Sequence, residues 1–195
     1  MKSTILCFLL SCYSFVVKSQ TIPQKNAIRV GASRVGLDAP DALGTRYEMH
    51  YTRLLGFSRI KFEAKAGVLK TEYYETIHPT FLNSRKRTSL DLVINYNVLK
   101  SYRHAIYPGF GFSIWYRKDM LLNQVQYETN SNGTVYVSSF TTRGFDEVNI
   151  GPYFSLQYEY RLLPSLSISI QSGLNSLGKA GWNSNLGLSL GYHFQ

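Results

Sequence analysis

Cysteine is nearly missing from this chain. The 195 residues contain only two, Cys7 and Cys12, and both lie within the first 20 positions. After Gln20 the sequence therefore offers no thiol for a disulfide framework or a thiolate metal site. Without such cross-links, we expect a packed core, backbone ladders or a membrane to hold this part of the chain together.

Long hydrophobic runs are also missing after Gln20. A membrane-spanning helix needs ~20 predominantly apolar residues. Lipid offers no hydrogen-bond partners to the backbone, so only helices and closed barrels can cross it. Any membrane span after Gln20 must therefore be made of β-strands.

The first 19 residues have the features of a signal peptide: Lys2 at the start, apolar residues from 5 to 17, and a plausible cleavage site at Val17-Lys18-Ser19. We therefore expect residues 1–19 to direct export and residues 20–195 to form one domain. An alternative is that Leu9-Leu10-Ser11-Cys12 is a lipobox, which would make Cys12 a lipidation site.

Acidic residues are few, since 12 Asp and Glu stand against 21 Lys and Arg, giving a formal net charge of +9. A basic chain suits nucleic acid or an anionic lipid surface. Export makes lipid the expected partner, and we expect no nucleic acid.

Apolar and polar residues alternate with a period of two in eight segments, which indicates eight β-strands. The last segment is the clearest, because its apolar side chains all fall on one side of an extended strand. These are Leu186, Leu188, Leu190, Tyr192 and Phe194. The other segments are 28–34, 46–55, 60–68, 90–98, 106–114, 148–160 and 166–174.

The connections between these segments are alternately long and short. An even number of strands with short turns at one end and long loops at the other is typical of outer-membrane barrels. The long connections are 36–44, 70–86, 117–143 and 175–181. Within 117–143, Asn130-Ser-Asn-Gly133 predicts a hairpin clear of the main sheet. Pro108 and Pro152 fall inside predicted strands, where we expect a bulge or a strand start.

The polar face of the strands carries charges of both signs, which we expect to pair in a narrow lumen. Its members are Arg46, Glu48, Lys61, Glu63, Lys65, Asp91 and Glu159. Eight strands leave an interior barely wide enough for side chains, so a plugged lumen is expected rather than an open pore.

Aromatic residues near the strand ends suggest two interfacial girdles, with Trp115, Tyr116, Phe145 and Trp182 near the long connections. A soluble lipocalin-like ligand-binding barrel is the alternative, although Gly31 is not followed by the usual x-Trp.

With these strands and an aromatic C-terminal end, the chain resembles the small OmpA- and OmpX-like barrels over about residues 28–194. The resemblance implies an all-β, eight-stranded antiparallel up-and-down transmembrane barrel in the bacterial outer membrane. It also implies that the insertion machinery contacts the last strand. The role expected is structural or a surface interaction, as in adhesins, and the alternative is a lipid-modifying enzyme.

No catalytic, cofactor or metal site is expected. The histidines His50, His78, His104 and His193 are scattered, without metal-ligand spacing. The His-x-Ser-Asn motif of lipid A deacylases has only a poor match at His50-Tyr51-Thr52-Arg53. His50 and His193 are therefore expected to fill the lumen.

Two surface functions are predicted for the long connections. The 117–143 segment is expected to bind a protein partner, with a hairpin edge that captures a strand, and the alternative is a solvated loop with no partner. Basic residues near the same end are expected to contact phosphates of lipopolysaccharide or other anionic headgroups, with simple snorkelling as the alternative. They are Arg85, Lys86, Arg87, Arg117, Lys118 and Arg143.

Overall fold

The computed structural model describes residues 25–37, 42–55, 59–74, 82–99, 101, 103–178 and 181–195. The predicted signal peptide, the Cys12 alternative and His78 lie outside these residues. No helix in the described part is long and apolar enough to cross a membrane. The strands are β1 (Asn26–Leu37), β2 (Ala42–Leu54), β3 (Ile60–Tyr74), β4 (Leu82–Tyr96), β5 (His104–Thr129), β6 (Val135–Leu163), β7 (Leu166–Ser176) and β8 (Trp182–Phe194).

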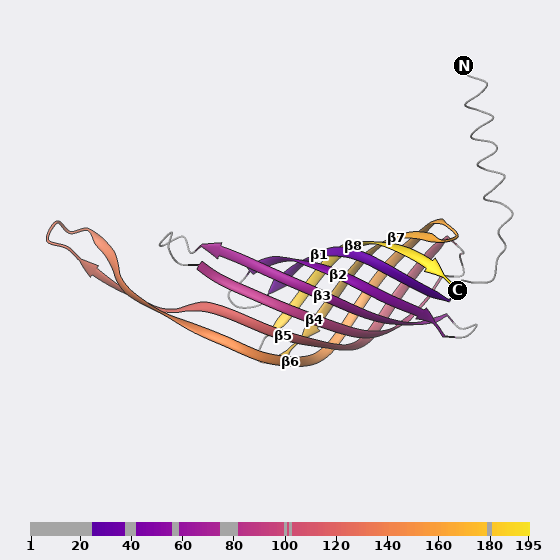
Figure 1. The fold of residues 1–195 in the computed structure, drawn as a ribbon, viewed down its shortest axis with the longest axis horizontal. Helices are drawn as coiled ribbons and strands as arrows, with labels where there is room; N and C mark the ends of the chain where they lie inside the picture. Colours follow the sequence, from indigo (N-terminus) through magenta and orange to yellow (C-terminus); the bar gives the residue numbers. More distant parts are fainter. Residues whose placement is uncertain are drawn as a thin grey trace, which may run out of the picture.

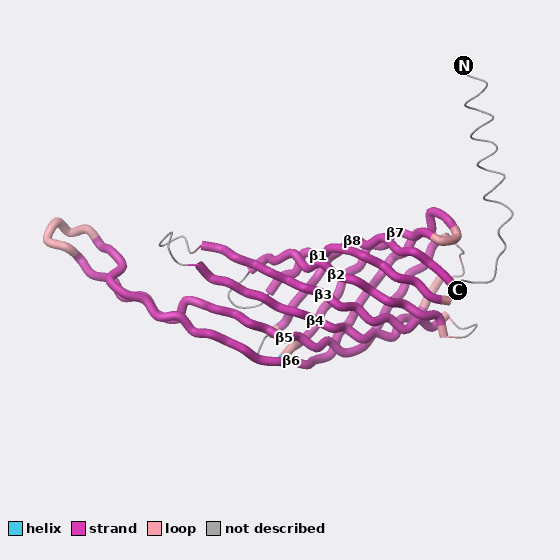
Figure 2. The backbone as a smooth tube through the Cα atoms, viewed as in Figure 1, coloured by secondary structure: helices cyan, strands magenta, loops and turns pink. Residues whose placement is uncertain are grey.

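The eight strands form a closed barrel in which each pairs antiparallel with its neighbours in sequence (Figure 1). The ring closes where β1 pairs with β8, from Asn26–Phe194 to Leu37–Asn183. The backbone tube shows the same continuous wall of strands (Figure 2). The predicted architecture is therefore confirmed.

The strand register makes the strands tilt. The chain of paired residues that starts at Ala27 passes once round all eight strands and returns to β1 at Leu37, ten residues further along. An eight-stranded barrel with this stagger has strands tilted by roughly 35–45° and an interior that side chains can fill. Each step from one strand to its partner also climbs along the barrel axis, so a row of paired residues follows a rising spiral.

The difference between the two ends arises from strand length more than from loop length. The segments 70–86 and 117–143, predicted as long connections, are mostly strand: β3 runs to Tyr74, β4 starts at Leu82, and β5 and β6 have 26 and 29 residues. In Figure 1 the β5–β6 hairpin extends far beyond the other strands, at the end opposite to the C-terminus. The prediction of a hairpin clear of the main sheet is confirmed.

The expectation of a bulge or strand start at the two prolines is wrong. Pro108 and Pro152 pair in regular register with Leu156 and Phe112. Each lies one residue beyond the last pair of a neighbouring ladder, Asn95–Gly109 for Pro108 and Tyr153–Asn175 for Pro152. The N–H that proline lacks is therefore not needed on that side.

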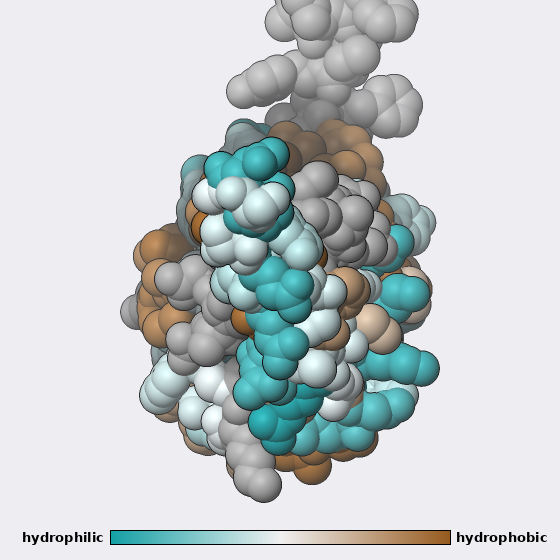
Figure 3. Space-filling view, turned by 90° about the vertical axis from the view of Figure 1, so that its left-hand side faces the viewer, coloured by the Kyte–Doolittle hydropathy of each residue, from teal (hydrophilic) through white to brown (hydrophobic). Residues whose placement is uncertain are grey.

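Alternation places apolar residues outside and polar residues inside. Along β8, Leu186, Leu188 and Leu190 are 57–61% exposed, whereas Ser189 and His193 are buried. Figure 3, viewed from the hairpin end, shows hydrophobic residues on the sides of the barrel. Trp115 corrects the predicted girdle, because it is buried inside the barrel, whereas Tyr116 and Trp182 are exposed on the outside.

Arginine on the apolar belt should block insertion. Leu188 lies halfway along β8, where Leu188→Arg should cost ~2–4 kcal/mol in a bilayer. Val148 is equally exposed but lies towards the hairpin, so Val148→Arg should cost at most ~1 kcal/mol. Folding into lipid vesicles, followed by heat-modified gel mobility and urea titration, measures both. Equal stability of the two variants would contradict a membrane-embedded belt.

Candidate functional site

The seven residues predicted for the lumen are all buried and lie together inside the barrel. Near the C-terminal end, the Arg29 guanidinium hydrogen-bonds to the Glu159 carboxylate and lies 3.7 Å from Glu63. The same Glu63 accepts a hydrogen bond from Asn95 at 3.0 Å. The Lys61 ammonium donates to Gln157 at 2.9 Å.

Further towards the hairpin, Arg46 connects two acidic residues. Its Nη2 lies 2.7 Å from Glu48 and its Nη1 lies 3.1 Å from Asp91. Gln171 donates to Glu48 at 2.6 Å and accepts from Lys65 at 3.0 Å. These contacts connect residues from β2, β3, β4 and β7 across the interior.

The lumen network is balanced in charge. Its four cations and four anions are Arg29, Arg46, Lys61, Lys65, Glu48, Glu63, Asp91 and Glu159. Enclosed charges are tolerated when they are paired and hydrogen-bonded. The sequence prediction omitted Arg29, Gln157 and Gln171. For Arg29 the signal was present, because it alternates with Ile28 and Val30.

Two of the histidines fill the lumen. His50 Nδ1 lies 3.1 Å from Glu63, and His193 Nε2 lies 3.2 Å from Glu159 and 2.8 Å from the Ser167 hydroxyl. His104 lies at the C-terminal end, exposed, with its Nδ1 2.7 Å from the Tyr158 hydroxyl. Among the described residues, no group of three or more His, Cys, Asp or Glu side chains has the geometry to hold a metal ion.

An apolar cluster lies inside the barrel between the lumen network and the hairpin end. Its members are Val35, Leu37, Leu69, Trp115 and Leu177. The Arg46 guanidinium lies 5.7 Å from the centre of the Trp115 ring, at the boundary between network and cluster. The sequence analysis missed this cluster because the inward positions change from polar to apolar there: Val35 and Leu37 are buried on the same face as Arg29 and Ser33, while Arg34 is exposed.

The six cations predicted to bind headgroups do not all lie on the outer surface, because alternate residues of a strand face opposite sides of the barrel wall. Arg85 and Arg87 are buried inside the barrel, and Arg87 pairs with Asp119 at 2.7 Å, so the prediction is wrong for both. Arg117 is largely buried as well, and lies 3.0 Å from Glu147. Lys86, Lys118 and Arg143 are exposed.

The exposed lysines belong to one row of paired residues. Lys70 pairs with Lys86, Lys86 pairs with Lys118, and Lys118 pairs with Asp146. Three like charges directly opposite one another on neighbouring strands destabilise the sheet unless an anion lies between them.

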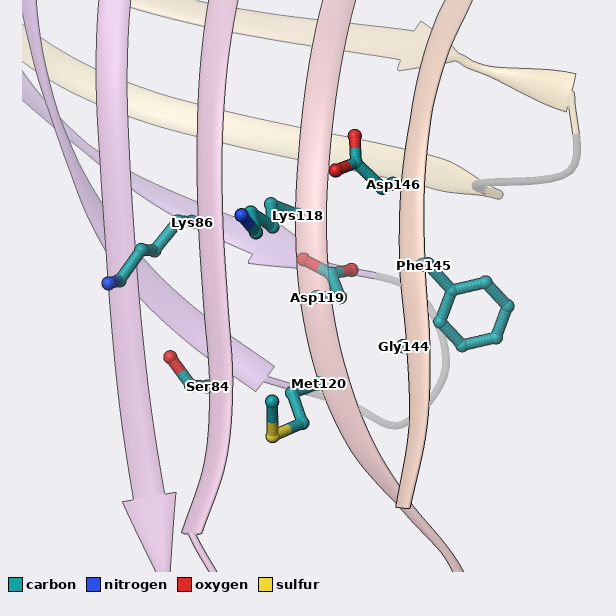
Figure 4. Close-up of a pocket in the computed structure, with 8 residues that line it drawn as sticks. All are labelled: Ser84, Lys86, Lys118, Asp119, Met120, Gly144, Phe145 and Asp146. Atoms are coloured by element: carbon teal, nitrogen blue, oxygen red, sulfur yellow. The ribbon is translucent and has the colours of Figure 1, made fainter.

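Beside the row lies a pocket of about 420 Å³ (Figure 4). In Figure 4, Met120 and Gly144 lie on neighbouring strands, and Gly144 contributes no side chain to fill the space beside Met120. The remaining lining residues are Ser84, Lys86, Lys118, Asp119, Phe145 and Asp146. The pocket thus joins two cations, two carboxylates and a hydroxyl to apolar surface, and one of the carboxylates, Asp119, is paired with Arg87.

The projecting part of the β5–β6 hairpin, residues 121–143, is called the ribbon below. One face is apolar, since the cross-strand pairs Val125–Phe140, Tyr127–Val137 and Thr129–Val135 lie on it. On the opposite face, Ser139 donates to Gln126 at 2.6 Å, and the Tyr136 hydroxyl donates to Glu128 at 3.0 Å.

The ribbon is closed by a glycine turn and interrupted by two bulges. Gly133 has a φ of 79°, the left-handed region that favours glycine, and the Asn130 side chain accepts hydrogen bonds from the backbone of Asn132 and Thr134. The register shifts once on each strand, at Asn123 and at Ser138. These bulges break the continuity of both ribbon edges.

No family model and no curated protein matches the chain. Solved structures do match it. Neisserial surface protein A is 12% identical, with a TM-score of 0.64, over 87% of this chain and 97% of its own. The attachment invasion locus protein Ail of Yersinia pestis is 12% identical, with a TM-score of 0.57, over 89% and 100%. OprG of Pseudomonas aeruginosa is 11% identical, with a TM-score of 0.56, over 90% and 99%.

The chain therefore has the fold of the small eight-stranded outer-membrane β-barrels. Together with the apolar outer wall, this fold supports a place in the bacterial outer membrane. At 11–12% identity, the likeness concerns the fold and carries no activity across.

The paired charges of the lumen should be strongly coupled. Glu159→Gln leaves the buried Arg29 charge with only the more distant Glu63 carboxylate, 3.7 Å away, which should cost up to ~3–5 kcal/mol of folding stability. The double variant Arg29→Met, Glu159→Gln removes both charges and should be less destabilised than the sum of the two single variants. Urea titration in lipid vesicles measures all four proteins. Additive losses would contradict a direct pairing.

Proposed function

We propose that this protein is an integral outer-membrane barrel with a plugged lumen, and that it acts through surface interactions made by the ribbon. The observation that carries the proposal is the amphipathic ribbon itself, which holds an apolar face clear of the barrel. Exposed apolar surface rimmed by polar residues is a mark of interaction sites. Rigid scaffolds commonly carry binding surfaces on their connections.

A plugged lumen is supported by two successive layers. The neutral lumen network joins side chains across the interior, and the apolar cluster around Trp115 lies between it and the ribbon end. An ion passing through would have to displace paired charges and then cross apolar side chains, which is costly. The barrel is therefore proposed as a support for its outer surface rather than as a channel.

The ribbon face is a better binding element than the ribbon edge that the sequence suggested. Capture of a partner strand needs an uninterrupted edge, and the bulges at Asn123 and Ser138 interrupt both. The apolar pairs continue along the face across the bulge at Ser138, so the face offers the longer continuous contact.

Replacing the apolar face should abolish surface binding. The variant Tyr127→Thr, Val137→Thr, Phe140→Thr keeps residues that favour strands while removing apolar area. Its matched control, Gln124→Thr, Gln126→Thr, Ser139→Thr, changes the opposite face. Cells that display each protein are tested for adhesion to abiotic and host-cell surfaces. We expect at least a tenfold loss for the first variant and less than a twofold change for the control.

Two results keep this test interpretable. Heat-modified gel mobility must be unchanged in both variants, since the ribbon lies outside the barrel wall. Adhesion that is lost equally from both faces, or from neither, would overturn the proposed role of the apolar face.

A second role, contact with phosphate groups of lipopolysaccharide, is favoured by the lysine row and the pocket of Figure 4. Lysines at the headgroup level attract anionic lipid by about 1 kcal/mol per charge. The structure of Ail with the heparin analogue sucrose octasulfate shows that a barrel of this fold can hold a polyanion.

We also propose that the C-terminal strand, which ends at Phe194, is bound by the barrel-insertion machinery during assembly.

Neutralising the lysines should release lipid. Lys86→Gln with Lys118→Gln should lower the lipopolysaccharide that co-purifies with the barrel at least fivefold. Arg53→Gln with Arg103→Gln, which changes two exposed cations at the C-terminal end, should lower it less than twofold. Phosphate analysis of the purified protein measures both. Equal losses would leave nonspecific snorkelling as the explanation.

A further inference from the structure

The apolar face of the ribbon is exposed on an element with no support from neighbouring strands. Pairing of β5 with β4 ends at Ser84–Met120, and pairing of β6 with β7 ends at Tyr153–Asn175. Within the described residues, the ribbon strands therefore pair only with each other. Tyr127 and Phe140 are each 49% exposed and Val135 is 61% exposed. Because a lone two-stranded hairpin is at best marginally stable in water, covering this face would stabilise it.

The composition of the ribbon narrows the choice of occupant. From Leu121 to Thr142 the only charged residue is Glu128. Charge complementarity, which selects basic or acidic partners, is therefore almost missing from this surface. Each of two identical ribbons would bring one negative charge near its tip, Glu128, which hydrogen-bonds to Tyr136, and one positive charge at its base, Arg143. Two copies of the ribbon can therefore pack together with little electrostatic repulsion.

The two faces and the two edges also differ in how they are protected. Natural sheets guard their edges with bulges or charged residues, and each ribbon strand carries a bulge. Nothing comparable guards the apolar face, which carries no charged side chain. The ribbon is therefore shaped to resist edge-to-edge pairing and to accept packing face to face.

We propose that the apolar faces of two copies pack against each other in one membrane, which forms a four-stranded sandwich above paired barrels. This inference rests on the proposed surface role of the ribbon and names its partner. A two-fold axis along the barrel direction brings identical faces together, as in isologous dimers. The faces of packed sheets lie ~10 Å apart, close enough for Tyr127, Val137 and Phe140 of both copies to interdigitate.

The interface between two ribbons is small, but confinement of both barrels to one membrane favours their association. Each face offers six residues, whereas a stable complex in solution uses roughly 20–30 residues on each side. The pairing should therefore be weak in detergent. Two barrels in one bilayer hold their ribbons parallel and at high effective concentration, which strengthens the contact without new residues.

Cysteine cross-linking tests the arrangement. The full chain carries Cys7→Ser and Cys12→Ser and is reconstituted in lipid vesicles. Thr129→Cys places one thiol on the apolar face and leaves its five apolar side chains intact, whereas the matched control Gln126→Cys places a thiol on the polar face. With a short bismaleimide, we expect at least tenfold more covalent dimer from Thr129→Cys. Adding Tyr127→Thr and Phe140→Thr should reduce the Thr129→Cys dimer to the level of the control.

The cross-linking and adhesion results together distinguish pairing between copies from the surface role of the ribbon. Equal cross-linking from the two faces, no cross-linking from either, or a Thr129→Cys dimer that survives Tyr127→Thr and Phe140→Thr would overturn pairing between copies. If cross-linking fails in one of these ways while the apolar-face variant still loses adhesion, the proposed surface role stands and the occupant is another molecule. If cross-linking succeeds but adhesion is unchanged, the pairing stands and the surface role fails.

Discussion

The rest of the structure depends on closure of the sheet. In lipid, an unpaired strand edge is too costly to persist, so β8 must pair with β1, and it does so along all of β1 and all but the first residue of β8. The offset of ten residues on going round the ring follows from the same pairings. It sets the tilt and thereby an interior just wide enough for side chains to fill. The lumen network and the apolar cluster are possible only in an interior of that width.

Closure also explains how so many charges are accommodated inside. The lumen network draws its cations and anions from β1, β2, β3, β4 and β6, with Gln171 from β7 and His193 from β8 completing it. Taken round the whole ring, this network contains as many cations as anions. Nearer the ribbon, the polarity of the two faces reverses, so that apolar Val35 and Leu69 lie inside while Arg34 and Lys70 lie outside. This reversal indicates where the apolar belt ends and the headgroup level begins.

The sequence predicted the parts of the fold that depend on alternation alone. Eight strands, and the position of Glu63 and Asp91 on the polar face, follow from a period of two. That this face points inward was predicted from its small residues and its charges of both signs. Failures occurred where strands are longer than predicted, as in β4, β5 and β6, or where a side chain's direction depends on register. Arg85 and Arg87 were treated as one exposed cluster with Lys86, although alternate residues of a strand must face opposite sides. The length of β5 and β6 beyond the membrane was underestimated because the polar residues in 117–143 resemble a loop. Trp115 was placed in the outer girdle by its position near a strand end, but its direction depends on register.

The distribution of the lumen network over distant strands has a consequence for the order of assembly. Arg29 of β1 meets Glu159 of β6, and Glu159 in turn meets His193 of β8, only once the ring has shut. Until β8 pairs with β1, these charged side chains need water or a polar chaperone surface as hydrogen-bond partners. A nascent barrel of this sequence therefore has to stay open to water along the β1–β8 seam while its outer wall enters the lipid. In this order of assembly, water leaves the interior after the wall has entered the lipid.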